Sequence, residues 1–115
     1  MKILSLARDP QLADARESAL REAGFDVSSA RDFRQLADLC KRHKFKLAII
    51  GHSFEPEVKR AVAAVLAESK PKPEILEIYL DKPILPNVAA LGSLDLQDLV
   101  WKVRELMRNI RSRSA

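Results

Sequence analysis

A histidine and a serine follow the most continuous apolar segment of the chain. Residues 46–50 run into Gly51-His52-Ser53. Histidine can act as a base or accept a phosphoryl group, and serine becomes a nucleophile when a base activates it. Adjacent residues of an extended chain point to opposite sides, and no carboxylate partner for His52 is evident. We therefore expect no catalytic residue here. His52 is interpreted as a loop histidine, and Ser53 as a cap for the next helix.

The elements that position this turn follow an alternating pattern of strands and helices. Asp9 and Pro10 are typical of a helix start, and Gly24 is typical of a helix end. The expected strands cover residues 3–6, 26–29, 46–50, 75–79 and 88–91. The expected helices run from Asp9-Pro10 to Gly24, over 32–43, from Glu55 or Pro56 to the break at 70–73, and over 95–111.

Apolar spacing predicts which face of each helix is buried. In the first helix the predicted buried residues are Leu12, Ala15, Ala19 and Ala23. In the third helix they are Val58, Ala61, Val62 and Val65. The last helix has the strongest apolar periodicity in the chain.

The alternation predicts a single α/β domain over residues 1–111, with a basic tail at 112–115. Five strands in a chain of this length indicate a flavodoxin-like three-layer sandwich, with a parallel sheet in the order 2-1-3-4-5. Residues 80–87 include two prolines and are too few for a usual crossover helix. The helix between the fourth and fifth strands is therefore expected to be shortened or absent.

Three segments resemble the receiver domains of response regulators, the CheY-like family. Residues 2–10 resemble the first strand and its acidic turn, residues 45–51 the strand that ends in the phosphorylated aspartate, and residues 94–99 the start of the final helix. The resemblance covers nearly the whole chain. It implies a CheY-like fold and a role in two-component signal transduction or a phosphorelay.

By the same resemblance, each position that the family uses for phosphoryl transfer carries a residue that cannot perform that role. The family's metal-binding carboxylates fall on Ala7 and Arg8, and only Asp9 remains acidic nearby. The remaining changed positions are Gly51 for the acceptor aspartate, Ile78 (or Glu77) for the hydroxyl residue, and Gly92 for the lysine. The guanidinium of Arg8 could occupy the vacated cation site and replace the charge of the metal. The resemblance thus implies a degenerate receiver, without enzymatic activity, metal or cofactor.

Two alternatives stay open. The rim formed by the carboxyl ends of the strands is where such sheets bind ligands, so Arg8, His52, Ser53 and Ser93 are candidates for an anion site. Gly51 fits either a sharp turn or a close approach of backbone or ligand. The net charge of +4 and the arginines of the last helix suggest nucleic-acid binding. Cations at helix ends are stabilised without any ligand, however, and this explanation is favoured.

A protein partner or a second copy of the chain is the expected binding partner. Ile84 and Leu85 in the altered link, together with Trp101 on the last helix, are the expected contact residues because exposed apolar and tryptophan side chains are common at interfaces. No apolar run is long enough for a membrane span or signal peptide, so a cytoplasmic location is expected. The lone Cys40 excludes an internal disulfide.

Overall fold

A computed structural model describes residues 2–114 of the chain. The strands of this part are β1 Lys2–Leu6, β2 Asp26–Ala30, β3 Phe45–Ile50, β4 Glu74–Ile78 and β5 Ala90–Gly92. Its helices are α1 Pro10–Glu22, α2 Phe33–Arg42, α3 Pro56–Ala67 and α4 Leu96–Ser114. None of these helices is both long enough and apolar enough to cross a bilayer.

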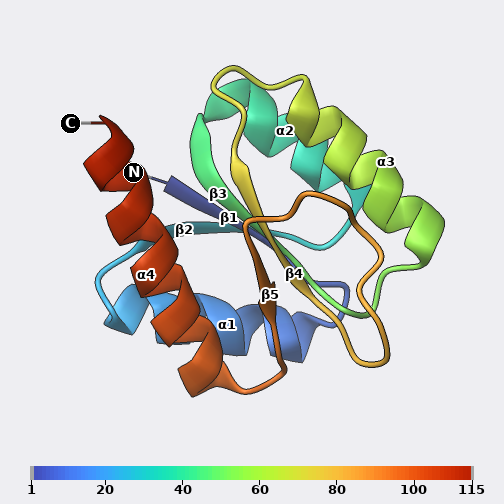
Figure 1. Cartoon of the computed structure of the whole chain (residues 1–115). Coiled ribbons are helices and arrows are strands. Elements are labelled where there is room, and N and C mark those ends of the chain that lie inside the picture. Colours follow the sequence, from blue (N-terminus) through green and yellow to red (C-terminus); the bar gives the residue numbers. More distant parts are fainter. Residues whose placement is uncertain (1, 115) are drawn as a thin grey trace.

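The strands form one parallel sheet in the order β2-β1-β3-β4-β5. Helices α1 and α4 cover one face of this sheet, and α2 and α3 cover the other (Figure 1). The predicted three-layer, flavodoxin-like fold with the order 2-1-3-4-5 is confirmed. Because both faces are covered, the central strands can be apolar throughout, as β3 is.

Side chains of the central strands alternate between two hydrophobic cores. Ile3 and Ile49 enter the core under α1 and α4, whereas Leu4 and Ile50 enter the core under α2 and α3. This period of two is the ordinary geometry of a strand. It decides which layer each residue at the carboxyl ends of β1 and β3 faces.

The first helix begins and ends where the sequence predicts. Asp9 is its N-cap, and Oδ1 of Asp9 accepts a hydrogen bond of 2.9 Å from the Gln11 backbone N–H. Gly24 follows the helix with a φ of 96°, a conformation that glycine adopts without strain. The predicted buried face is wrong, however. Its buried residues are Ala13, Arg16 and Leu20, and the predicted set (Leu12, Ala15, Ala19, Ala23) is only partly buried.

The third helix shows the same kind of difference. Its buried residues are Lys59, Val62 and Leu66, whereas Ala61, predicted to be buried, is exposed. In both helices a cation occupies the inward-facing stripe. A prediction from apolar spacing alone places charged residues on the solvent side of a helix, so it missed the burial of Arg16 and Lys59.

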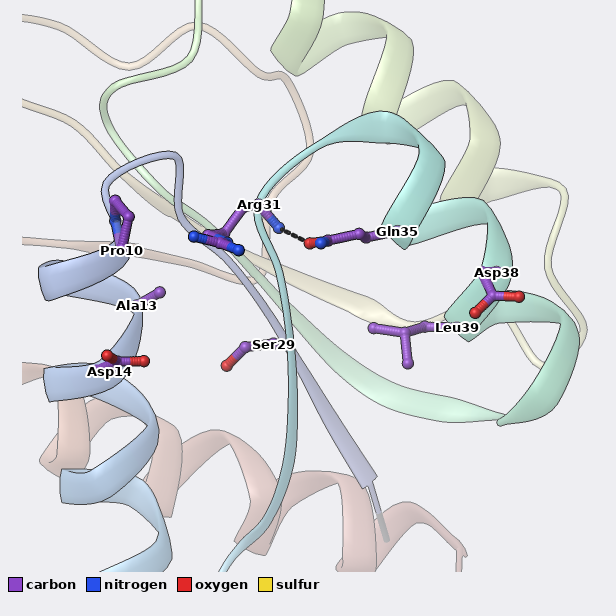
Figure 2. Close-up of a pocket in the computed structure, with 8 residues that line it drawn as sticks. All are labelled: Pro10, Ala13, Asp14, Ser29, Arg31, Gln35, Asp38 and Leu39. Carbon is purple, nitrogen blue, oxygen red and sulfur yellow. Dashed lines mark hydrogen bonds between the residues drawn. The ribbon is translucent and has the colours of Figure 1, made fainter.

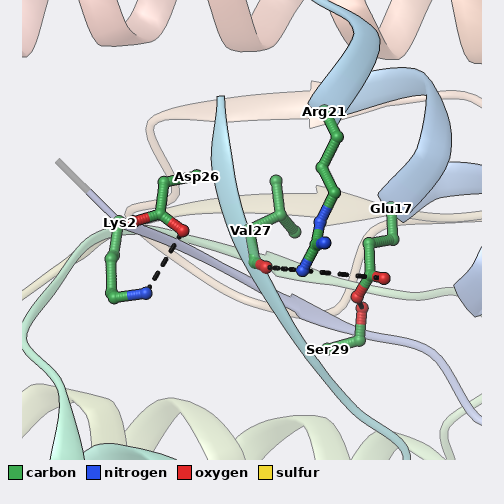
Figure 3. Close-up of polar contacts among 6 residues, drawn as sticks. All are labelled: Lys2, Glu17, Arg21, Asp26, Val27 and Ser29. Carbon is green, nitrogen blue, oxygen red and sulfur yellow. Dashed lines mark hydrogen bonds and ion pairs between the residues drawn. The ribbon is translucent and has the colours of Figure 1, made fainter. Parts of the chain in front are cut away.

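Polar contacts with the edge strand hold α1 in this rotation (Figure 3). The Ser29 hydroxyl donates to Oε1 of Glu17 at 2.8 Å, and Nη2 of Arg21 donates to the Val27 carbonyl at 3.0 Å. Arg21 and Glu17 also form an ion pair one helical turn apart. With Glu17 and Arg21 turned toward β2, Arg16 faces the interior.

The link between β4 and β5 contains no helix over residues 79–89, as predicted. The fifth strand, expected over 88–91, is shifted to Ala90–Gly92. The last helix continues past its expected end at Arg111 to Ser114. The sheet face beside α3 is therefore covered by an extended link where a crossover helix would ordinarily lie.

Candidate functional site

The carboxyl ends of β1 and β3 approach each other closely at Gly51. The Gly51 backbone N–H donates to the Leu6 carbonyl at 2.8 Å. A Cβ atom at position 51 would lie 2.7 Å from that carbonyl oxygen and 3.1 Å from Nη1 of Arg16. Gly51 does not have a positive φ. Of the two explanations for this glycine, the close approach of backbone and guanidinium is therefore the correct one.

Arg16 is a buried charged residue beside Gly51. It comes from the middle of α1 and is 1% exposed. Its Nη2 atom is buried and has no hydrogen-bond partner among the described residues. Burial lowers the pKa of Arg16, and the charge of Asp9 works in the opposite direction. Because a guanidinium stays protonated in proteins, a buried positive charge lies beside Gly51.

Arg8 is exposed, and the guanidinium that lies beside Gly51 is that of Arg16. The preceding residue, Ala7, is buried and donates its backbone N–H to the Ala30 carbonyl at 3.1 Å. Arg8 follows at the point where the chain leaves the sheet.

His52 lies at the same rim and is partly buried. Its Nδ1 atom is buried and, within the described part of the chain, has no hydrogen-bond partner. Burial lowers the pKa of His52; the charges of Arg16 and Lys59 lower it further, against the opposing effect of Asp9. These effects favour the neutral form of His52. The local hydrogen bonds expected for this histidine are not formed at Nδ1.

Ser53 is exposed and does not cap the third helix, contrary to expectation. The helix begins at Pro56, so its N-cap is Glu55, whose side chain makes no capping bond. Ser53 lies two residues too early because Phe54 turns into the core between α3 and the sheet. Its hydroxyl remains at the rim.

A second buried cation lies on α3. Lys59 is 3% exposed and donates to Oε2 of Glu77 at 2.8 Å and to the Ile78 carbonyl at 3.1 Å. Glu77, fully buried on β4, also accepts from the backbone N–H groups of Ile84 and Leu85 at 2.9 and 3.0 Å. Burial raises the pKa of Glu77, but these three donors outweigh it and hold the carboxyl ionised. Glu77 thus anchors the link to the sheet.

The remaining positions assigned from the resemblance lie elsewhere or carry no reactive group. Ile78 is part of the core under α4, and a Cβ atom at Gly92 would lie 2.8 Å from Cδ2 of Leu76. The Ser93 hydroxyl accepts from the Asp95 backbone N–H and donates to Asp98 at the start of α4. Since β4 separates β5 from β3, Ser93 lies about 10 Å away across the sheet and does not join Arg16 and His52.

The three residues expected to contact a partner do not lie on one face of the sheet. Leu85 is 7% exposed and packs in the core beside α3, and Ile84 is half-buried. Trp101 is 60% exposed and belongs to α4, which covers the opposite face. Leu85 is therefore a core residue, whereas Trp101 is available at the surface.

A groove of about 490 Å³ opens between α1 and α2 beside β2 (Figure 2). Its lining residues are Pro10, Ala13, Asp14, Ser29, Arg31, Gln35, Asp38 and Leu39. None of the sequence-predicted site residues lines it. Across residues 2–114, no group of three or more histidine, cysteine or acidic side chains is arranged to hold a metal ion.

Comparison with known proteins supports the fold assignment. No protein-family model and no curated protein matches the chain. Among solved structures, the signal receiver domain of an HD domain-containing protein from Pseudomonas fluorescens Pf-5 is similar with a TM-score of 0.82 and 16% identity, over 96% of this chain and 97% of that chain. The N-terminal domain of a response regulator/sensory box/GGDEF 3-domain protein from Carboxydothermus hydrogenoformans gives 0.81 and 13% identity over all of both chains. A CheY-like receiver domain protein from Methanospirillum hungatei JF-1 gives 0.78 and 18% identity, over 96% and 97%.

Proposed function

We propose that this chain, which has the fold of response-regulator receiver domains, is a degenerate receiver that acts in signal transduction by binding a protein partner without being phosphorylated. The single observation that carries the proposal is the lack of room for a side chain at Gly51. A carboxylate side chain at the acceptor position would need room that the Leu6 carbonyl and the Arg16 guanidinium occupy. The proposal includes a cytoplasmic location and no enzymatic activity.

The surroundings of Gly51 support the same conclusion. Acceptor chemistry in receivers needs Mg²⁺, a hard cation that prefers several oxygen ligands. Here Asp9 is the acidic residue that follows the carboxyl end of β1, and its Oδ1 is engaged at the start of α1. The buried charge of Arg16 further disfavours a divalent cation at this rim. Signalling by this domain therefore depends on its surfaces.

The first test is a phosphorylation assay. The purified chain is incubated with Mg²⁺ and acetyl phosphate, and separately with beryllofluoride, beside an active receiver domain as the positive control. We expect no phosphoryl adduct by intact-mass spectrometry and no Mg²⁺-dependent change of amide chemical shifts with beryllofluoride. A hydroxylamine-sensitive adduct on this chain would show that the proposal is wrong.

Trp101 is the strongest candidate for a partner contact. An exposed tryptophan is a frequent hot spot, and alanine at such a position often costs 2 kcal/mol or more, about a 30-fold loss of affinity. We expect Trp101→Ala to lose a specific partner in a pull-down or to dissociate a homodimer in sedimentation analysis. Phe33→Ala is the matched control, because Phe33 is an exposed aromatic residue (42%) on α2, across the sheet. If neither binding nor assembly depends on Trp101, this surface is not the one used.

The nucleic-acid alternative has weaker support. Arg108 pairs with Glu105, and Arg113 pairs with Glu74, so two of the arginines of α4 are already partly neutralised. In the other basic segment, Arg42 pairs with Asp38. These contacts are what cations near helix ends make in the absence of a nucleic acid.

A further inference from the structure

Within residues 2–114, two buried nitrogen atoms that have no hydrogen-bond partner lie at the same rim of the sheet. They are Nη2 of Arg16 and Nδ1 of His52. A buried donor without an acceptor costs about 1–3 kcal/mol, and more when the group is charged. Arg16 cannot avoid this cost by losing its proton. Native structures retain such groups where a ligand or bound water completes them.

The nearby acidic groups do not complete this site. Asp9 is close enough to raise the pKa of Arg16, but its Oδ1 accepts from the Gln11 backbone N–H at the start of α1. Glu77 is saturated by Lys59 and by the two N–H groups of the link. The guanidinium therefore provides a positive charge in a low-dielectric environment, where attraction for an anion is strong.

We propose that the rim between the carboxyl ends of β1 and β3 binds an oxyanion of the phosphate class, held by the Arg16 guanidinium and the His52 imidazole. A guanidinium presents several N–H donors in one plane, which matches the oxygens of phosphate and similar anions. His52 donates from Nδ1 in one of its neutral tautomers. This site differs from the anion site expected from sequence, because Arg16 replaces Arg8 and Ser93 lies too far away.

The two loops that border this site face solvent. Arg8, Asp9 and Ser53 are exposed, and His52 is partly exposed. The free anion and the phosphate group of a larger metabolite share the chemistry recognised here.

The test is a titration of the full chain with inorganic phosphate, against sodium chloride at matched ionic strength. We expect saturable amide shifts at Gly51 and His52 by NMR and a saturable rise of the unfolding temperature. Sulfate should give the same response, whereas acetate should give a weaker one. Phosphomonoesters that bind more tightly than free phosphate would identify a metabolite as the natural source.

Arg16→Met is the decisive variant, because it keeps an unbranched apolar side chain in this position and removes the charge. We expect it to weaken phosphate binding roughly tenfold or more, as the loss of a charge-assisted hydrogen bond predicts. Arg8→Met is the matched control from the same rim, and it should bind like the wild type. If Arg16→Met does not fold, His52→Ala provides the second test, with an expected weakening and loss of the shifts at that position.

Three results would overturn the proposal. They are a wild-type response that does not saturate, an equal response in Arg16→Met, and an equal loss in Arg8→Met. None of these results depends on whether the chain binds a partner through Trp101 or escapes phosphorylation. Failure of the anion site is therefore distinguishable from failure of the proposed function.

Discussion

Replacing Glu77 with leucine is expected to lower the free energy of unfolding by about 3–5 kcal/mol. The substitution leaves the Lys59 ammonium, which is 3% exposed, with the Ile78 carbonyl as its remaining partner. It also leaves the backbone N–H groups of Ile84 and Leu85 without their acceptor. An uncompensated buried charge and two unpaired donors together explain the size of the loss.

Urea unfolding measures this loss, and Asp38→Asn is the matched control. Asp38 pairs with Arg42 at 3.0 Å, but both side chains are more than half exposed, so its removal should cost less than about 1 kcal/mol. In Lys59→Met/Glu77→Leu the whole pair is replaced by apolar groups, and much of the stability should return. A cost of Glu77→Leu no larger than that of Asp38→Asn would contradict the role assigned to the buried pair.

The same variant should loosen the link between β4 and β5. Glu77 accepts two backbone hydrogen bonds from the link and so holds it against the sheet, where a crossover helix would otherwise pack. Hydrogen exchange at Ile84 and Leu85 is therefore expected to accelerate in Glu77→Leu by more than the global loss of stability explains. Exchange at the central strand β3 should follow the global change.

Arg16→Met is expected to stabilise the protein by about 1–4 kcal/mol in a chloride buffer without oxyanions. Among the described residues Nη2 of the buried Arg16 guanidinium has no partner, which costs free energy in the folded state, and methionine fills much of the same volume without a charge. Urea unfolding is again the measurement, with the exposed Arg8→Met expected to change stability by less than about 0.5 kcal/mol.

The outcome of that measurement also bears on why Arg16 is present. Residues that lower stability without a structural benefit are typical of functional sites. A gain of stability together with loss of phosphate binding would identify Arg16 as such a residue. A large loss of stability in Arg16→Met would instead mean that the guanidinium is fully paired in solution, and the electrostatic interpretation of the rim would be wrong.

The sequence contained one signal of the buried pair that helix periodicity does not reveal. Residues 74–78 read Glu-Ile-Leu-Glu-Ile, so Glu77 interrupts an apolar strand that a parallel sheet buries on both faces. A carboxylate at such a position requires a partner, because burial of an unpaired charge is prohibitively costly. The partner, Lys59, lies 18 residues away in the chain. Its identity follows only from the way α3 packs on the sheet.

The order of strands and helices was determined by local patterns in the sequence. Apolar segments, the Asp9-Pro10 helix start and the proline-rich link are short-range features, and they predicted the 2-1-3-4-5 sheet and the absence of a helix over 79–89. That position 51 is glycine and not aspartate was likewise evident from the sequence. Such features depend on residues that are neighbours in the chain, so one sequence is enough.

Only the tertiary structure decided which cation occupies the rim. The rotation of α1 about its axis depends on its contacts with β2. Rotating the helix by the angle between successive residues would bury a different set of side chains. That rotation buries Arg16, whereas the end of β1 leaves Arg8 in solvent. The energy of placing a charge inside is a sum over neighbours from several elements. It therefore exists only once the helices have packed on the sheet.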